Sequence, residues 1–150
     1  MKLRELRRED WELVLAWRNS PLINKGFYSQ SNGHLIQWDE HCKWIESRAN
    51  WMYFIIEHEG RRIGGVTLGQ LDHWSPEIGY FIGEVTLWGK GLGKQAVEMA
   101  IAWLKEKGYK YCHTTVLNDN MRSRNLLESL GFTYMAEARP GEVWMQKCVA

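Results

Sequence analysis

Three glycines, Gly89, Gly91 and Gly93, stand directly before a long helical pattern, and this arrangement restricts the possible folds more than any other stretch. Apolar residues recur at helical spacing over 90–107, which predicts an amphipathic helix that ends at Gly108. Amide groups left unpaired at a helix start, together with the helix dipole, attract anions. Glycines let the main chain approach a phosphate closely. The sequence therefore predicts a phosphate-binding turn at the start of this helix.

Two lysines strengthen this prediction, because Lys90 and Lys94 place positive charge beside the turn. Two familiar phosphate-binding motifs nevertheless do not fit. A Walker loop requires glycine where this chain has Trp88 and serine or threonine where it has Gln95. The dinucleotide pattern GxGxxG requires a further glycine in place of Lys94.

The remaining periodicity predicts an α/β fold, a mixed sheet with helices on its faces. The expected element order is β-α-α-β-β-β-α-β-α-β-β. We expect strands over residues 2–7, 51–58, 62–71, 76–83, 110–117, 133–138 and 142–147, and helices over 9–19, 37–48, 90–107 and 118–132.

Local signals mark several boundaries. Glu59-Gly60 between two strands indicates a tight hairpin. An asparagine caps the start of the helix at 118–132, and Gly131-Phe132 predicts a glycine-type helix stop. Ser20-Pro21 ends the first helix, and the Ser-, Asn- and Gly-rich residues 20–35 are expected to form a loop.

Length and composition favour one globular domain over residues 1–150, since 45% of the residues are hydrophobic and 25% are charged. A formal net charge of +1 argues against nucleic acid as a partner. Three cysteines without metal-ligand spacing argue against a disulfide framework or a zinc site and favour a reducing, cytoplasmic location. No apolar run approaches the roughly 18 residues of a membrane span, so we expect no membrane association.

Two segments carry a resemblance to a known family. WGKGLG at 88–93 resembles the pyrophosphate-binding motif of the GNAT acetyltransferase superfamily, Gln/Arg-x-x-Gly-x-Gly/Ala, with Trp88 at the position that is usually Gln or Arg. VLNDNMRSRNLLESLGF at 116–132 is similar to the superfamily's N…NxxSxxxLxxxGF segment. The resemblance implies a GNAT fold, in which the strand at 76–83 and the strand at 110–117 splay apart.

The resemblance also implies a co-substrate, acetyl-CoA, and no metal. Its pantetheine arm is expected between the splayed strands, paired with main-chain groups of Phe81, Ile82 and Gly83. Asn118, Asn120 and Ser123 are expected near it. The residues expected to bind the pyrophosphate are Trp88, Gly89, Lys90, Gly91, Leu92, Gly93 and Lys94.

Acetyl transfer to an amine needs a base, because an amine of pKa about 10.4 is protonated at neutral pH. Glu77 matches the carboxylate that many superfamily members carry in this strand, and His113 is the alternative base. A main-chain N–H near Ile82 would stabilise the oxyanion. Many members carry a tyrosine in the last helix that protonates the leaving thiol, but this chain has Leu127 there, which leaves the acid unassigned.

The N-terminal half is similar to the aminosugar branch, the acetyltransferases of pseudaminic-acid-type sugar-nucleotide pathways. This likeness implies a nucleotide-linked aminosugar as the acceptor. The residues expected to contact it are Trp17, Arg18, Phe27, Tyr28 and His41. Two alternatives remain open: acetylation of the N-terminal α-amino group of a ribosomal protein, and a non-catalytic module that binds acyl-CoA. A homodimer paired through an edge strand such as 142–147 is a further option.

Overall fold

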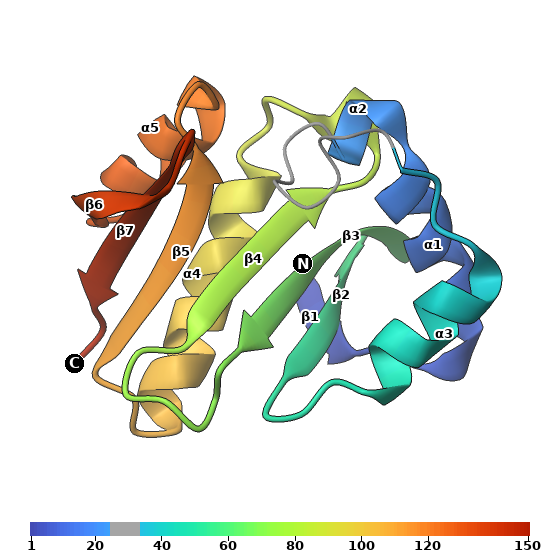
Figure 1. Cartoon of the computed structure of the whole chain (residues 1–150), viewed down its shortest axis with the longest axis horizontal. Coiled ribbons are helices and arrows are strands. Elements are labelled where there is room, and N and C mark those ends of the chain that lie inside the picture. The colour runs from blue at the N-terminus through green and yellow to red at the C-terminus, as the bar shows by residue number, and fades with distance from the viewer. Residues whose placement is uncertain (25–33) are drawn as a thin grey trace.

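A seven-stranded sheet organises the chain in the computed structural model, which describes residues 1–24 and 34–150 (Figure 1). The strand order is β1-β2-β3-β4-β5-β7-β6, and every neighbouring pair is antiparallel except β4 and β5, which are parallel. This mixed, mostly antiparallel α/β sheet confirms the predicted fold class. The strands are β1 (Lys2–Glu5), β2 (Met52–His58), β3 (Arg61–Gly69), β4 (Glu77–Ile82), β5 (Tyr111–Leu117), β6 (Thr133–Arg139) and β7 (Glu142–Cys148).

Helices pack on both faces of this sheet. α4 (Leu92–Glu106) and α5 (Met121–Ser129) contribute to the larger apolar core, on the face that we call the α4 face. α1 (Trp11–Asn19) and α3 (Trp38–Glu46) pack with the smaller core on the opposite face, the α1 face. Short helices complete the described chain: α2 (Pro21–Asn24) and the 3-10 turns at Arg8–Asp10 and Val85–Leu87.

β2 shows how the sequence specifies two cores. Its side chains alternate, so Phe54 and Ile56 enter the core on the α4 face, whereas Tyr53 and Ile55 enter the core on the α1 face. All four are buried. A shift of register by one residue would exchange the two sets, and the strand is therefore held strongly in place.

The local boundary signals are confirmed. Glu59-Gly60 joins β2 to β3, with His58 paired to Arg61. Asn120 caps α5 by accepting a hydrogen bond from the Ser123 amide at 3.3 Å. At the other end of α5 the Phe132 amide donates to the Leu127 carbonyl at 3.0 Å, as expected for a helix that ends before a glycine.

Two expectations need correction. Residues 20–35 are not wholly a loop, because Pro21–Asn24 forms α2, and proline favours the first position of a helix. The strand at 142–147 is not an edge strand, because β7 lies between β5 and β6 and both of its edges are already paired. The edge strand on that side is β6, so a dimer cannot form through β7. No helix of the described residues is long and apolar enough to cross a membrane.

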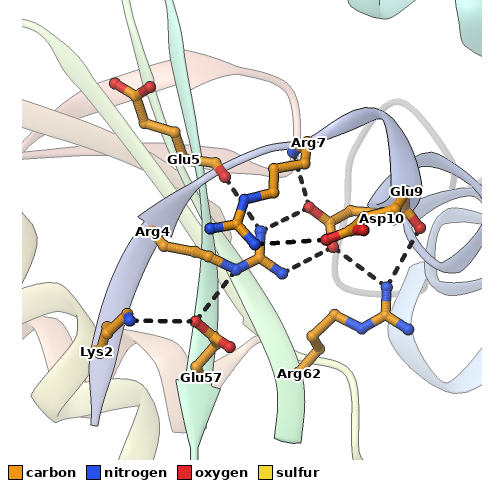
Figure 2. Close-up of polar contacts among 8 residues, drawn as sticks. All are labelled: Lys2, Arg4, Glu5, Arg7, Glu9, Asp10, Glu57 and Arg62. Carbon is orange, nitrogen blue, oxygen red and sulfur yellow. Dashed lines mark hydrogen bonds and ion pairs between the residues drawn. The ribbon is translucent and has the colours of Figure 1, made fainter. Parts of the chain in front are cut away.

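A buried carboxylate connects the N-terminal strand to α1 and to the sheet (Figure 2). Asp10 has no exposed surface, and Arg4 donates two hydrogen bonds to its carboxylate, at 2.8 and 2.9 Å. The Arg7 amide donates at 2.8 Å and Arg62 of β3 at 3.2 Å. Arg4 also donates to Glu57 of β2 at 3.1 Å. One carboxylate thus fixes the approach of α1 to three strands.

These hydrogen bonds decide the charge of Asp10. Burial alone would disfavour the ionised carboxylate, but donors from Arg4, the Arg7 amide and Arg62 outweigh that cost and lower the pKa of Asp10 to about 2. The folded protein therefore holds Asp10 ionised at neutral pH.

Asp10→Asn is expected to lower the free energy of unfolding by about 3 kcal/mol at pH 7, because it removes the buried carboxylate that pairs with the largely buried Arg4 and leaves that guanidinium with the partly exposed Glu57. The wild-type stabilisation should be complete above pH about 4 and should fall as pH drops toward 2, since the folded pKa lies below the ordinary value of 3.8. Urea unfolding at a series of pH values measures both effects. Glu9→Gln removes an exposed neighbouring carboxylate and should change stability by less than about 0.5 kcal/mol; equal losses for both variants would contradict the assignment.

Candidate active site

β4 and β5 separate after a single paired position. Glu77 and His113 form the one β4–β5 pair of the described chain, and the His113 amide donates to the Pro76 carbonyl at 2.9 Å. β4 nevertheless continues to Ile82 and β5 to Leu117. The splay predicted between these parallel strands is confirmed, and Figure 1 shows them diverging toward the start of α4.

A cleft of about 850 Å³ occupies the space between the two strands. Five segments meet there: α2, the second half of β4, the turn into α4, the second half of β5 and the start of α5. Its lining residues are 22–23, 79–82, 87–89, 91–94, 114–117, 119–120, 122–123 and 126. The cleft thus brings together most of the residues predicted to bind the co-substrate, but neither Lys90, Asn118 nor Gly83.

The register of β3 and β4 decides which main-chain groups of β4 face the cleft. The Gly83 amide donates to the Ile63 carbonyl of β3 at 2.7 Å. Because main-chain groups alternate along a strand, those of Phe81 also point toward β3, whereas those of Tyr80 and Ile82 point toward the cleft. The prediction that Phe81 and Gly83 offer main-chain groups to pantetheine is therefore wrong. The main-chain groups of Ile82 keep their predicted role in the cleft, and those of Tyr80 face the cleft as well.

The Trp88 side chain already binds one of these cleft-facing main-chain groups. Its indole N–H donates to the Ile82 carbonyl at 2.8 Å, so that carbonyl already has a partner. The Ile82 amide remains directed toward the cleft. Trp88 therefore holds the end of β4 through this side-chain hydrogen bond. Its position in the glycine turn did not predict the contact.

The glycine turn presents the start of α4 to the cleft. Gly91 is the N-cap of α4, with φ of 77°, in the left-handed region that favours glycine. The amides of Leu92, Gly93 and Lys94 follow in the first helical turn, where they have no partner within the helix. All three residues line the cleft, and the helix dipole adds positive potential there.

Arg122 is a cation of the cleft that sequence reasoning missed. It lies in the first turn of α5 and lines the cleft, and its guanidinium lies 5.1 Å from the centre of the Trp88 ring. Lys94 lines the cleft from α4. The signal that could have revealed Arg122 is its position two residues after the N-cap Asn120, on the segment already predicted to contact the co-substrate.

The start of α5 contributes polar groups of unequal accessibility. Asn120 and Ser123 line the cleft, although Asn120 also caps the helix. Asn118 accepts a hydrogen bond from Arg124 at 3.0 Å and does not line the cleft. The Ser123 hydroxyl is hydrogen bonded to the hydroxyl of Tyr80, which also lines the cleft. Burial raises the pKa of Tyr80, and the bond to Ser123 offsets part of that rise.

Glu77 lies at the closed end of the splay. Its side chain is on the same face of β4 as Gly79, a lining residue about 7 Å farther along the strand, and 43% of that side chain is exposed. Behind it stands His113, which is buried and stacked on Trp144 at 4.0 Å between ring centres. The His113 Nδ1–H donates to the Ser75 carbonyl at 2.7 Å, and Nε2 lies 3.5 Å from a Glu77 carboxylate oxygen. His113 can therefore reach a substrate only through Glu77.

Trp17 is a core residue and not an accessible stacking surface. It is 5% exposed, and its ring meets the edge of Phe81 with 5.4 Å between centres. It also packs on Gly83, where a Cβ atom would lie 2.2 Å from the indole nitrogen. Only a glycine permits this approach. The prediction that Trp17 contacts the acceptor is corrected accordingly.

His41 is corrected for a similar reason. It is fully buried, its Nε2–H donates to the Trp11 carbonyl at 2.8 Å, and its Nδ1 accepts from Arg18 at 2.9 Å. Neither ring nitrogen is left for an acceptor. Arg18 lies with its guanidinium 3.9 Å from the centre of the Trp44 ring, and its predicted contact with the acceptor stays a prediction. Phe27 and Tyr28 lie outside the described residues.

A metal centre has no support among residues 1–24 and 34–150, where no group of three or more His, Cys, Asp or Glu could hold an ion. The site consists instead of an open cleft, two cationic side chains and unpaired helix amides. This arrangement defines a class of acetyltransferase folds whose sheet opens between two parallel strands. The chain belongs to the GNAT acetyltransferase family, because the sequence model of that family, described as an acetyltransferase (GNAT) domain, matches residues 1–133.

Two relatives from one organism match nearly the whole of this chain. An uncharacterized protein of Methanocaldococcus jannaschii is 42% identical over 144 residues, which are 93% of this chain and 29% of that protein. A solved domain from the same organism has a TM-score of 0.92 at 39% identity, covering 98% of this chain and 97% of its own. The chain therefore spans 29% of the length of this relative.

A more distant structure shares the fold. Spermidine N-acetyltransferase from Vibrio cholerae, solved with CoA and spermine, has a TM-score of 0.85 at 19% identity. The match covers 98% of this chain and 94% of that one.

The buried His41 predicts a pH-dependent stability. Burial lowers the pKa of His41 despite the hydrogen bond to Trp11, and the Arg18 charge lowers it further. Below pH about 6.5 the unfolded chain binds a proton at His41 that the folded chain does not bind. The free energy of unfolding should therefore fall there by up to about 1.4 kcal/mol per pH unit. His41→Gln should remove this slope, as measured by urea unfolding between pH 7.5 and 5. His73→Gln, at an exposed histidine, should keep it; a slope that persists in His41→Gln would refute the assignment.

Proposed function

We propose that this chain transfers the acetyl group of acetyl-CoA to a primary amine of a small molecule. The observation that carries the proposal is the cleft between β4 and β5, which has the glycine turn of α4 at its open end. The first-turn amides of α4, with Lys94 and Arg122, supply the charge that a pyrophosphate requires. The apolar stretch between the strands suits an extended pantetheine arm. Lys90 stays a predicted phosphate contact from the same turn.

Glu77 is the proposed general base. Neutralising an amine of pKa about 10.4 at pH 7 costs roughly 4.6 kcal/mol, and a carboxylate that takes the proton directly or through a water lowers that cost. The partial exposure of Glu77 on the α1 face supports this role, because an amine approaching over Gly79 and Phe81 would meet it there. His113 holds a fixed orientation behind the carboxylate.

The Ile82 amide is the proposed oxyanion donor. Its direction toward the cleft supports this assignment, since an amide aimed at a developing oxyanion stabilises the transition state more than the ground state. The hydrogen bond from Trp88 to the Ile82 carbonyl holds this peptide in place.

A nucleotide-linked aminosugar is the first acceptor to test, and the resemblance of the N-terminal half supports it. Among the described residues, Arg18 is the proposed contact with this acceptor that remains, because Trp17 and His41 are buried. A cytoplasmic location is proposed from the cysteine pattern.

The decisive assay measures CoA release from acetyl-CoA with a panel of an aminosugar nucleotide, a polyamine and a peptide with a free N-terminus. Acetylation of the peptide alone would replace the small-molecule proposal, and CoA binding without turnover on any amine would refute the enzyme proposal.

Lys94→Glu should weaken CoA binding by about tenfold to hundredfold, because it replaces a charge-assisted phosphate contact with repulsion. Isothermal titration calorimetry with CoA measures the dissociation constant. Lys105→Glu makes the same charge change in the last turn of the same helix, away from the cleft, and should leave the affinity unchanged. Equal dissociation constants for Lys94→Glu and wild type would argue against a phosphate at this turn.

Glu77→Gln should lower kcat by about 100-fold at pH 7, while the dissociation constant for CoA stays within about twofold. The deficit should shrink as pH rises, because more of the amine is then unprotonated in solution. Steady-state rates with the acceptor identified from the panel provide the measurement. Glu84→Gln, just beyond the other end of β4, is the matched control and should retain full kcat. A wild-type rate in Glu77→Gln would assign the base elsewhere.

A further inference from the structure

The departing sulfur needs a proton donor, and Leu127 cannot provide one. Leu127 is 1% exposed, packs in the core on the α4 face and does not line the cleft. Among the described residues that line the cleft, Tyr80 carries the only phenol. A phenol has an ordinary pKa of about 10, nearer to the roughly 8.5 of a thiol than any aliphatic hydroxyl.

We propose that Tyr80, hydrogen bonded to Ser123, protonates the thiolate that leaves during acetyl transfer, an assignment that rests on the proposed function. The Tyr80 and Ser123 hydroxyls come from β4 and α5 and meet at the cleft wall. Tyr80 would thus supply the acid that the sequence leaves unassigned, from another element of the fold.

The position of Tyr80 along β4 supports the assignment. Tyr80 lies between Glu77, the proposed base, and Ile82, whose amide points into the cleft. An acyl carbon that contacts the Ile82 amide and receives an amine deprotonated by Glu77 must lie beside Tyr80. At a rise of about 3.3 Å per residue, Tyr80 lies roughly 10 Å from Glu77 and about 7 Å from Ile82 along the strand, so Tyr80 can stand beside the acyl group while Glu77 takes the amine proton through a water.

The two faces of β4 separate the entering and leaving groups. Glu77 and Phe81 project toward the α1 face, where the amine is proposed to enter. Tyr80 projects toward the α4 face, where its ring approaches Gly93 and its hydroxyl meets Ser123. The thioester sulfur is proposed to lie in the cleft, on the side where the Tyr80 and Ser123 hydroxyls meet. The leaving group therefore departs on the side that carries the phenol.

The chemical step balances as follows. The C–S bond breaks, its electron pair moves onto the sulfur, and the Tyr80 hydroxyl proton passes to the sulfur to give the free thiol. Ser123 donates a hydrogen bond to the phenolate oxygen, which regains a proton from solvent before the next turnover. Burial raises the pKa of Tyr80, so the phenol is protonated when turnover begins. The Ser123 hydrogen bond offsets part of this rise by stabilising the phenolate that the proton transfer leaves behind.

The test varies the leaving group. Without an acid the thiol leaves as thiolate, which limits the loss at pH 7 to about thirtyfold, the ratio set by a thiol pKa of about 8.5. We therefore expect Tyr80→Phe to lower kcat for acetyl-CoA by about tenfold to thirtyfold. With two small acetyl thioesters as donors, the variant should lose about tenfold in kcat/KM with an alkyl thiol and less than about twofold with an aryl thiol of pKa below 7, which leaves readily as thiolate.

Controls separate this role from a structural one. Tyr109→Phe removes a hydroxyl that donates to the Leu71 carbonyl at 2.6 Å outside the cleft, and it should affect neither thioester. Ser123→Ala should show the same dependence on the leaving group at smaller amplitude, and it provides the test if Tyr80→Phe does not fold. Equal losses with both thioesters, or no loss with either, would overturn the assignment. A wild-type protein that acetylates no amine would instead refute the proposed function.

Discussion

The divergence of β4 and β5 is the constraint on which the rest of the site depends. Parallel strands normally satisfy their main-chain groups along their full length, yet here the described chain pairs them only at Glu77 and His113. Beyond that point the edges of two central strands face each other across a cleft of about 850 Å³. Unpaired main-chain groups in the middle of a sheet form a ready partner for an extended ligand, and this is how the fold acquires a binding site without a separate domain.

Strand alternation then distributes the chemistry. One face of β4 carries Glu77 and Phe81 toward α1, and the other carries Ile78 and Tyr80 toward α4 and α5. The peptide groups follow the same rule, so Ile82 offers its amide to the cleft while Gly83 is bonded to β3. A single strand thereby presents a carboxylate, a phenol and an amide in three different directions along its length.

Much of this could be predicted from the sequence where the signal is local. The turn at 88–93, the N-cap Asn120 and the hairpin Glu59-Gly60 depend on residues close together in the chain, and the structure contains each of these elements. Trp17 and His41 could not be assigned in this way. An aromatic or polar residue on a helical stripe looks the same whether it faces a cleft or a core, and here close packing on Gly83 and a hydrogen bond to Trp11 bury them.

The sequence by itself determined the fold class, the glycine turn and the family, because these depend on spacing and on backbone conformations that few residues adopt. Tertiary structure alone decided which groups meet. Arg122 reaches the cleft from α5 and lies against Trp88, Tyr80 meets Ser123, and His113 stands behind Glu77, each across a long separation in the chain. Such pairs depend on register and on helix packing, and a linear pattern does not encode these locally.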